Sequence, residues 1–154
     1  MKNRKRGFSL VELLIVLAVI AALIATITPV ALNAIRKAKA TQVAQNLKTL
    51  ASAVENKAYV EGAGSLTSTL SITLLARDVK GSEYGAYIIP GTTGSYTVSV
   101  FYGGGDAAFD SVKDVLGNVT QGAITTDTSG FYLAGGLSST NANTIKYVFP
   151  FTVY

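Results

Sequence analysis

The 23 residues from Leu13 to Ile35, which carry no ionisable side chain, restrict the possible folds of this chain more than any other feature. As an α-helix, at ~1.5 Å per residue, this run would be about 35 Å long, enough to cross the roughly 30 Å apolar core of a bilayer. Between Phe8 and Ile35 there is one ionisable side chain, Glu12. In a chain of 154 residues such a helix leaves material for one small domain.

The net charge lies ahead of this run. Four Lys and Arg side chains within residues 1–7 account for the whole formal charge of +4, because the rest of the chain holds nine basic and nine acidic side chains. Three more cations follow the run within residues 36–39. Since the flank richer in Lys and Arg usually stays in the cytoplasm, we expect a cytoplasmic N-terminus and export of residues 36–154.

A secretory signal peptide is the alternative interpretation of the same segment. Ala38-Lys39-Ala40 has the small-x-small pattern of a cleavage site. However, the apolar run is longer than the usual 7–15 residues, three cations crowd the site, and the helical pattern continues through it. A membrane anchor that stays attached is therefore favoured.

A second, amphipathic helix is predicted over residues 36–61. This stretch has no Gly or Pro, and its apolar residues recur at spacings of four, three and four, at Val43, Leu47, Leu50 and Val54. The glycines of Gly62-Ala63-Gly64 should end it. The sequence thus predicts a helix that is half membrane anchor, over residues 8–35, and half domain spine, over residues 36–61.

Pro29 is the one helix-breaking residue within residues 8–61. Proline in a helix interior removes one backbone hydrogen bond and clashes with the preceding turn, at a cost of about 3 kcal/mol. We expect a kink or a loosened segment near residues 25–29.

Residues 62–154 have the composition of a small β-rich domain, with 14 of the 15 glycines and seven of the eight tyrosines. Alternating residues around a Gly91–Gly94 turn predict a hairpin. The predicted elements are a short helix at Ile72–Ala76, strands at Tyr84–Pro90 and Tyr96–Tyr102, one or two helical turns at Asp106–Leu116 with Asp106 as N-cap, and strands at Phe131–Leu133 and Ile145–Tyr154. Pro150 should place the last strand at an edge or interrupt it. The expected fold class is α+β, a long N-terminal helix packed against a small antiparallel sheet.

The composition excludes several kinds of chemistry. With no Cys, His or Trp, the chain cannot form a disulfide, a zinc site of the Cys/His type or a nucleophile built on Cys or His. No cofactor is expected, and we predict that the protein is not an enzyme. The exported part beyond residue 61 carries four basic and six acidic side chains, which argues against nucleic-acid binding by this part alone.

Two weaker patterns remain. Asp106, Asp110 and Asp114 are spaced i, i+4 and i+8 and are weak candidates for a calcium site, although acidic residues at a helix start more often form a solvated face. We therefore predict no metal. Asn118-Val119-Thr120 fits the sequon for N-glycosylation, a short pattern that often arises by chance.

The segment Lys5-Arg6-Gly7-Phe8-Ser9-Leu10-Val11-Glu12-Leu13-Leu14 resembles the N-terminal signature of bacterial type IV pilins and type II secretion pseudopilins. The resemblance combines a short basic leader, Gly before Phe, Glu five residues after the Gly, and an apolar span that contains a Pro. It covers residues 1–61. The absence of Cys departs from many Gram-negative pilins, which close the C-terminal part of the head with a disulfide, so here packing, hydrogen bonds or an ion must hold that part.

The resemblance implies roles for individual residues. A prepilin peptidase at the cytoplasmic face would cut between Gly7 and Phe8, removing residues 1–7, and the new Phe8 amine would be N-methylated by the same peptidase/N-methyltransferase. Glu12 would pair in the membrane with the Phe8 amine of a neighbouring subunit. Pro29 matches the position at which pilin helices bend or unwind in the filament.

The resemblance also implies a function. The chain would be a structural subunit, most simply the major pilin, of a type IV pilus; the alternative is a type II secretion pseudopilin or a minor pilin for adhesion or DNA uptake. Its partners would be the processing enzyme, further copies of itself in a homopolymeric helical filament, and the inner-membrane assembly machinery. The precursor would cross the inner membrane once, and the mature form would lie in an extracellular pilus or a periplasmic pseudopilus.

Overall fold

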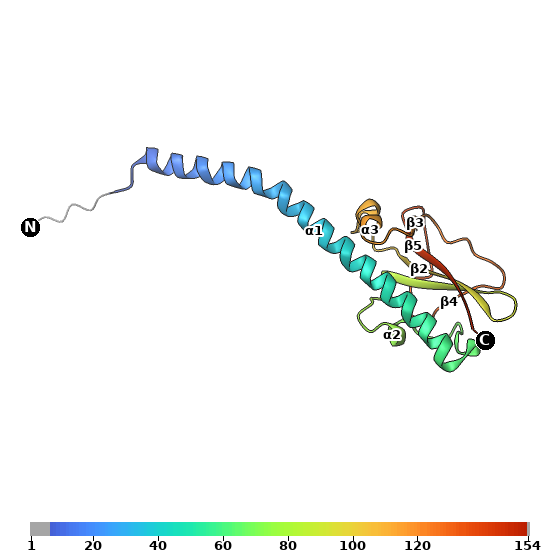
Figure 1. Cartoon of the computed structure of the whole chain (residues 1–154). Helices are drawn as coiled ribbons and strands as arrows, with labels where there is room; N and C mark the ends of the chain where they lie inside the picture. The colour runs from blue at the N-terminus through green and yellow to red at the C-terminus, as the bar shows by residue number, and fades with distance from the viewer. Residues whose placement is uncertain (1–6, 154) are drawn as a thin grey trace, which may run out of the picture. The chain divides into compact units, whose positions relative to one another are not determined.

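The computed structural model describes residues 7–153, which divide into two units between Ile35 and Arg36. Within the described residues the elements are α1 (Leu10–Glu61), a 3-10 turn (Ala63–Ser65), α2 (Ile72–Leu75), β1 (Tyr84–Pro90), β2 (Ser95–Tyr102), α3 (Phe109–Val115), β3 (Val119–Gln121), β4 (Phe131–Tyr132) and β5 (Ile145–Thr152) (Figure 1). The fold class is α+β, as predicted.

The helix α1 has 52 residues and starts at Leu10, two residues later than predicted. It ends at Glu61, where Gly62 adopts a φ of 85° that favours glycine. The helical assignment continues through Pro29. In the turns before it, the hydroxyls of Thr26 and Thr28 donate to the carbonyls of Leu23 and Ile24, at 2.9 and 2.7 Å. The expected kink near Pro29 stays a prediction.

The N-terminal unit has no core of its own. Every described residue of this unit is exposed, and the most apolar 18-residue window of α1 has a mean hydropathy of 2.9 with none of it buried. Among the residues described, α1 is the one helix that is long and apolar enough to cross a membrane by length and composition. A core helix of a soluble domain would be mostly buried, whereas this apolar segment is exposed, which fits a membrane-anchored precursor.

A five-stranded antiparallel sheet, in the order β3-β5-β2-β1-β4, forms the centre of the second unit. The predicted hairpin is confirmed: β1 and β2 pair from Tyr84↔Tyr102 to Pro90↔Tyr96. The turn between them needs two consecutive positive φ angles, 56° at Thr93 and 73° at Gly94. Placing these angles side by side reverses the chain and sets the register of the hairpin.

The last strand, β5, differs from its prediction. It lies inside the sheet, between β2 and β3, because β3 was not predicted. However, β3 pairs only with residues 145–147, so at Pro150 the strand is paired with Thr97 of β2 and open on its other side. Pro150 therefore stands at a locally open edge, where its missing N–H breaks no pairing.

One face of the sheet packs against the C-terminal half of α1 (Figure 1). The residues of α1 in this core recur at helical spacing and are Ala40, Val43, Ala44, Leu47, Leu50, Ala51, Val54 and Ala58. They meet alternate residues of the central strands, including Ile88 of β1 and Val98 and Val100 of β2, all fully buried. The apolar residues that recur at helical spacing in α1 and at every second position in the strands thus form a single apolar layer.

The opposite face of the sheet is also covered, which the sequence did not predict. Tyr87 of β1 and Phe101 of β2 form a second cluster with Ile124, which belongs to the segment after β3. The Tyr87 hydroxyl donates to the Asp127 carbonyl and accepts from the Asp127 N–H, both at 2.8 Å. Lys146 Nζ donates to the carbonyl of Ala123 at 2.8 Å. Packing and hydrogen bonds therefore hold the C-terminal part of this cysteine-free domain.

Leu47 offers a test of the α1–sheet layer. Its side chain is fully buried, so Leu47→Ala should destabilise the domain by about 2–5 kcal/mol through lost apolar contacts and a residual cavity. Denaturant unfolding of the whole chain in detergent, followed by tyrosine fluorescence, measures this. Gln45→Ala, at an exposed position of the same helix, is the control and should change stability by less than about 0.5 kcal/mol. Equal effects of the two substitutions would contradict the described packing.

Candidate functional site

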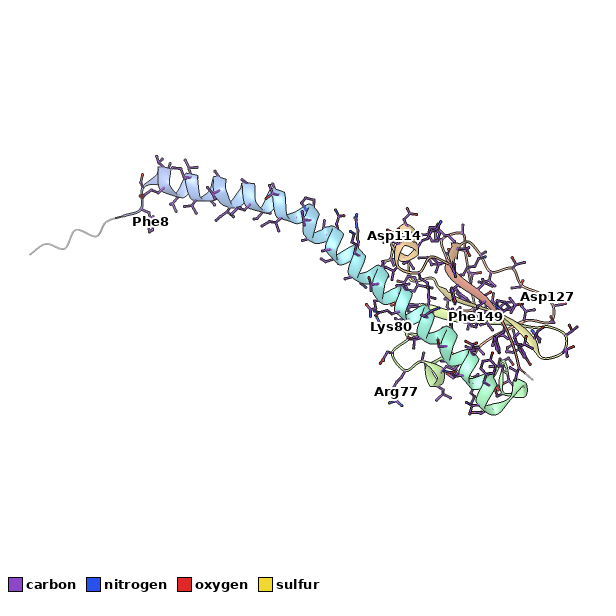
Figure 2. All side chains as sticks on the ribbon, viewed as in Figure 1. Phe8, Arg77, Lys80, Asp114, Asp127 and Phe149 are labelled. Carbon is purple, nitrogen blue, oxygen red and sulfur yellow. The ribbon has the colours of Figure 1, made fainter. Side chains whose placement is uncertain are left out.

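The segment before α1 is not helical and is accessible. Gly7, Phe8 and Ser9 are not helical, and the Phe8 side chain is 84% exposed (Figure 2). No atom lies within 4 Å of where a Cβ on Gly7 would stand. The Gly7–Phe8 peptide bond thus lies outside the helix. The rest of the predicted leader, residues 1–6, lies outside the described residues.

Glu12 has a partner within its own chain. The backbone N–H of Ser9, the residue before the first turn, donates to Glu12 Oε2 at 2.9 Å, and the N–H of Leu13 donates to the Ser9 carbonyl at 3.3 Å. A carboxylate three residues after the N-cap that returns to the N-cap N–H is half of a capping box. The Ser-x-x-Glu spacing of residues 9–12 is the sequence signal for it, and our sequence analysis missed it.

This bond has two chemical consequences for Glu12. It fixes the start of α1 at Leu10 and holds the carboxylate at the positive end of the helix dipole. It also leaves Oε1 without a hydrogen-bond partner among residues 7–153. A cation that approached this end of the helix would therefore find an oriented anionic oxygen.

The alternative cleavage motif, Ala38-Lys39-Ala40, lies inside α1. Ala40 is fully buried against the sheet, and Lys39 forms an ion pair with Asp106. Lys39 and Ala40 are thus part of the folded second unit.

Asp106 belongs to an ion pair and not to a helix, so its predicted role as N-cap is wrong. α3 starts at Phe109, with Ala108 at the N-cap and no side-chain capping bond. Instead, Asp106 Oδ2 accepts from Lys39 Nζ at 2.5 Å, and Oδ1 accepts from the Tyr102 hydroxyl. Partners on α1 and β2 therefore take both oxygens that capping would have used.

This clasp of Lys39, Tyr102 and Asp106 has electrostatic effects on both ends of the ion pair. The hydrogen bond from Lys39 lowers the pKa of the Asp106 carboxyl, and the same bond raises the pKa of Lys39. Both side chains are about half exposed, so water screens much of the attraction. The clasp ties the Gly103–Gly105 loop to α1.

The other two weak metal candidates, Asp110 and Asp114, lie on α3, whereas Asp106 precedes this helix. Figure 2 labels Asp114. Across residues 7–153 no three His, Cys, Asp or Glu side chains are grouped so that they could hold a metal ion. We assign no metal role to these carboxylates.

A small polar pocket adjoins the clasp. Its volume is about 60 Å³, and its lining includes Asn46, Asp78, Lys80 and Glu83. Within it the amide of Asn46 donates to the Tyr84 hydroxyl at 3.0 Å, and burial raises the pKa of Tyr84. Pockets that bind small organic molecules usually measure about 300–1,000 Å³, so this one has room for water and not for a substrate.

The aromatic residues of β5 form a stacked row. The ring centroids of Tyr147 and Phe149 lie 5.5 Å apart and those of Phe149 and Phe151 6.1 Å apart, and Lys48 lies 5.2 Å from the Tyr147 centroid. These rings pack against the α1–sheet core. Their stacking is therefore part of the domain's own packing, which supplies no free platform for bases.

Comparison with known proteins agrees with the N-terminal geometry. Residues 2–28 match the family model described as the prokaryotic N-terminal methylation motif. This motif is the prepilin signature of type IV pilins and pseudopilins, and it extends into the apolar part of α1, which fits a membrane-anchored precursor. Neither the search of curated proteins nor that of solved structures gave a match. The match is confined to the N-terminal part of the chain, so it supports a relation to pilins and pseudopilins through this segment.

The clasp predicts a pH dependence of stability. Because the pKa of Asp106 is lowered on folding, its ionised form contributes stability above the ordinary value of 3.8, and this contribution is lost as the pH falls through the folded-state pKa. Asp106→Asn should therefore lower the melting temperature at pH 7, with a smaller difference from wild type at pH 3. Asp114→Asn, on the exposed side of α3, is the control and should show no such trend. Thermal melts in detergent across this pH range measure both; parallel curves for the two variants would remove the role of the ion pair.

Proposed function

We propose that this protein is the major structural subunit of a type IV pilus, made as a prepilin. Residues 1–7 form the leader, residues 8–35 the membrane-spanning and filament-core segment, residues 36–61 the amphipathic spine, and residues 62–154 the head. The observation that carries the proposal is the methylation motif at residues 2–28, which extends into the exposed apolar part of α1. The protein has no catalytic role of its own.

The first step of the proposed pathway is processing at the cytoplasmic face of the inner membrane. The prepilin peptidase cuts the Gly7–Phe8 bond, and the amine that it frees on Phe8 is methylated. The non-helical and exposed residues 7–9 support this step, because the scissile bond can enter an enzyme without unwinding α1.

The second step is assembly through α1. A carboxylate in a lipid environment is costly unless it is paired, and the within-chain bond from Ser9 supplies a hydrogen but no charge. The methylated amine of Phe8 on a neighbouring subunit would supply the positive charge at the Glu12 oxygen that the capping box leaves open. The pairing would also set how far one subunit is shifted along the filament relative to the next.

A pseudopilin of type II secretion, or a minor pilin, is the alternative within the same class. The processing and pairing steps are shared, so they do not separate these proteins. Mechanical shearing of cells does: a major pilin should be the most abundant chain in long surface filaments, and a pseudopilin should remain in the periplasm. Sheared material in which this chain is scarce would replace the first proposal with the second.

Gly7 tests the cleavage assignment. Gly7→Leu should leave full-length precursor in the membrane, because a side chain next to the scissile bond obstructs the peptidase. Since a Cβ on Gly7 meets no atom within 4 Å, the substitution leaves the fold of the chain intact. Intact mass and N-terminal sequencing measure the result, and Gly7→Ala is the small-residue control. Wild-type chains should begin at methylated Phe8; a wild-type chain that begins at Thr41 would instead establish signal-peptide cleavage.

Glu12 tests the pairing. Glu12→Val should enter the membrane and be processed but should not form filaments on its own, because the counter-charge for Phe8 is gone. Glu12→Gln is the informative partner variant, since glutamine can still accept from the Ser9 N–H but carries no charge. We expect it to fail as Glu12→Val does, as measured by the amount of subunit in sheared filaments. Normal filaments from Glu12→Gln would show that capping, and not charge, is what assembly needs.

A further inference from the structure

The sequon at residues 118–120 lies at the surface of the second unit. Asn118-Val119-Thr120 is the single Asn-x-Ser/Thr triplet with x other than Pro in the sequence. Asn118 lies in the turn after α3, and Val119 and Thr120 are the first two residues of β3. Asn118 and Thr120 are exposed, and Val119 between them is 3% exposed. The buried Val119 anchors the triplet, while the amide and the hydroxyl on either side of it remain in solvent.

The amide of Asn118 is free of other bonds. In the described part of the chain neither Asn118 nor Thr120 makes a side-chain hydrogen bond or an ion pair. Other asparagines are engaged: Asn46 donates to Tyr84, and the Asn141 side chain accepts from the Asn143 N–H at 2.8 Å. Modification of Asn118 would therefore break no described contact.

The strand β3, which begins within the triplet, lies at one edge of the sheet. β3 pairs with β5 through Thr120↔Lys146 and its two neighbours, and no other described strand pairs with its outer edge. An enzyme could approach the triplet from this side without displacing a paired strand. The buried side chain of Val119 and the pairing with β5 would hold the acceptor still.

We propose that Asn118 is an N-glycosylation site, which a transferase modifies on the exported face of the membrane. The donor would be a glycan linked through pyrophosphate to a polyprenyl lipid. The Asn118 amide nitrogen forms a bond to the anomeric carbon of the first sugar, the bond from that carbon to the pyrophosphate oxygen breaks, and one amide proton passes to a base of the transferase. The transferase would recognise the hydroxyl of Thr120. The inference rests on the proposed export of residues 36–154.

A glycan at this position would have a physical effect on the head. Open strand edges expose unpaired N–H and C=O groups and can pair with another chain. A bulky, hydrated glycan beside β3 would obstruct such pairing at this edge of the sheet. It would thereby add to the effect of the short length of β3, which already discourages pairing between heads.

The test is the mass of the tryptic peptide that spans residues 114–146, from protein isolated from its own cells. Wild type should carry a glycan mass on Asn118. Asn118→Gln and Thr120→Val should lose it, and Thr120→Ser, which keeps the hydroxyl, should retain it. An unmodified Asn118 in wild-type protein overturns the inference, and so does a glycan that survives Thr120→Val.

The same samples separate this inference from the proposed function. The N-terminal peptide reports processing: a start at methylated Phe8 with an unmodified Asn118 leaves the pilin proposal standing and removes the glycosylation site. A retained leader in wild type removes the pilin proposal, whatever the mass at Asn118. Melting temperatures of the four proteins without their glycans show whether a variant has lost the modification through misfolding.

Discussion

The uncharged half of α1 is the constraint on which the rest of this molecule depends. Its side chains are exposed throughout residues 10–35, and each Å² of apolar surface left in water costs about 25 cal/mol. In the proposed function, a bilayer covers this surface in the precursor, and the helices of other copies cover it in the filament. The bilayer and the neighbouring helices would cover the same side chains, so the chain could pass from one environment to the other without refolding its head.

Glu12 shows how one polar group is tolerated in such a segment. The Ser9 N–H satisfies one carboxylate oxygen and holds it at the start of the helix, which reduces the cost of placing it in lipid. The charge itself remains. A subunit that is stable alone but has one uncompensated charge has a reason to associate with a cation at the same depth, and the proposed Phe8 amine is such a cation.

Local patterns predicted much of this fold and site. The spacing of Val43, Leu47 and Leu50 gave the buried face of α1, and the Gly91–Gly94 turn gave the hairpin. What the sequence could not show depends on distant partners. Asp106 binds Lys39, 67 positions earlier, and not α3, while the second apolar cluster needs Ile124 from a segment without periodicity. β3 has only three residues, too few for an alternating pattern. By contrast, the Ser-x-x-Glu spacing of residues 9–12 is a local signal from which the bond between Ser9 and Glu12 could have been predicted.

The edges of the sheet explain why assembly through α1 would dominate over pairing between heads. Both faces of the central strands are covered, by α1 and by the segment after β3. The outer strands β3 and β4 have three and two residues, and Pro150 stands where β5 is open. Short edge strands and proline discourage the addition of a further strand. Because its outer strands are short, the head offers few strand edges that could compete with the long apolar surface of α1 in the proposed assembly.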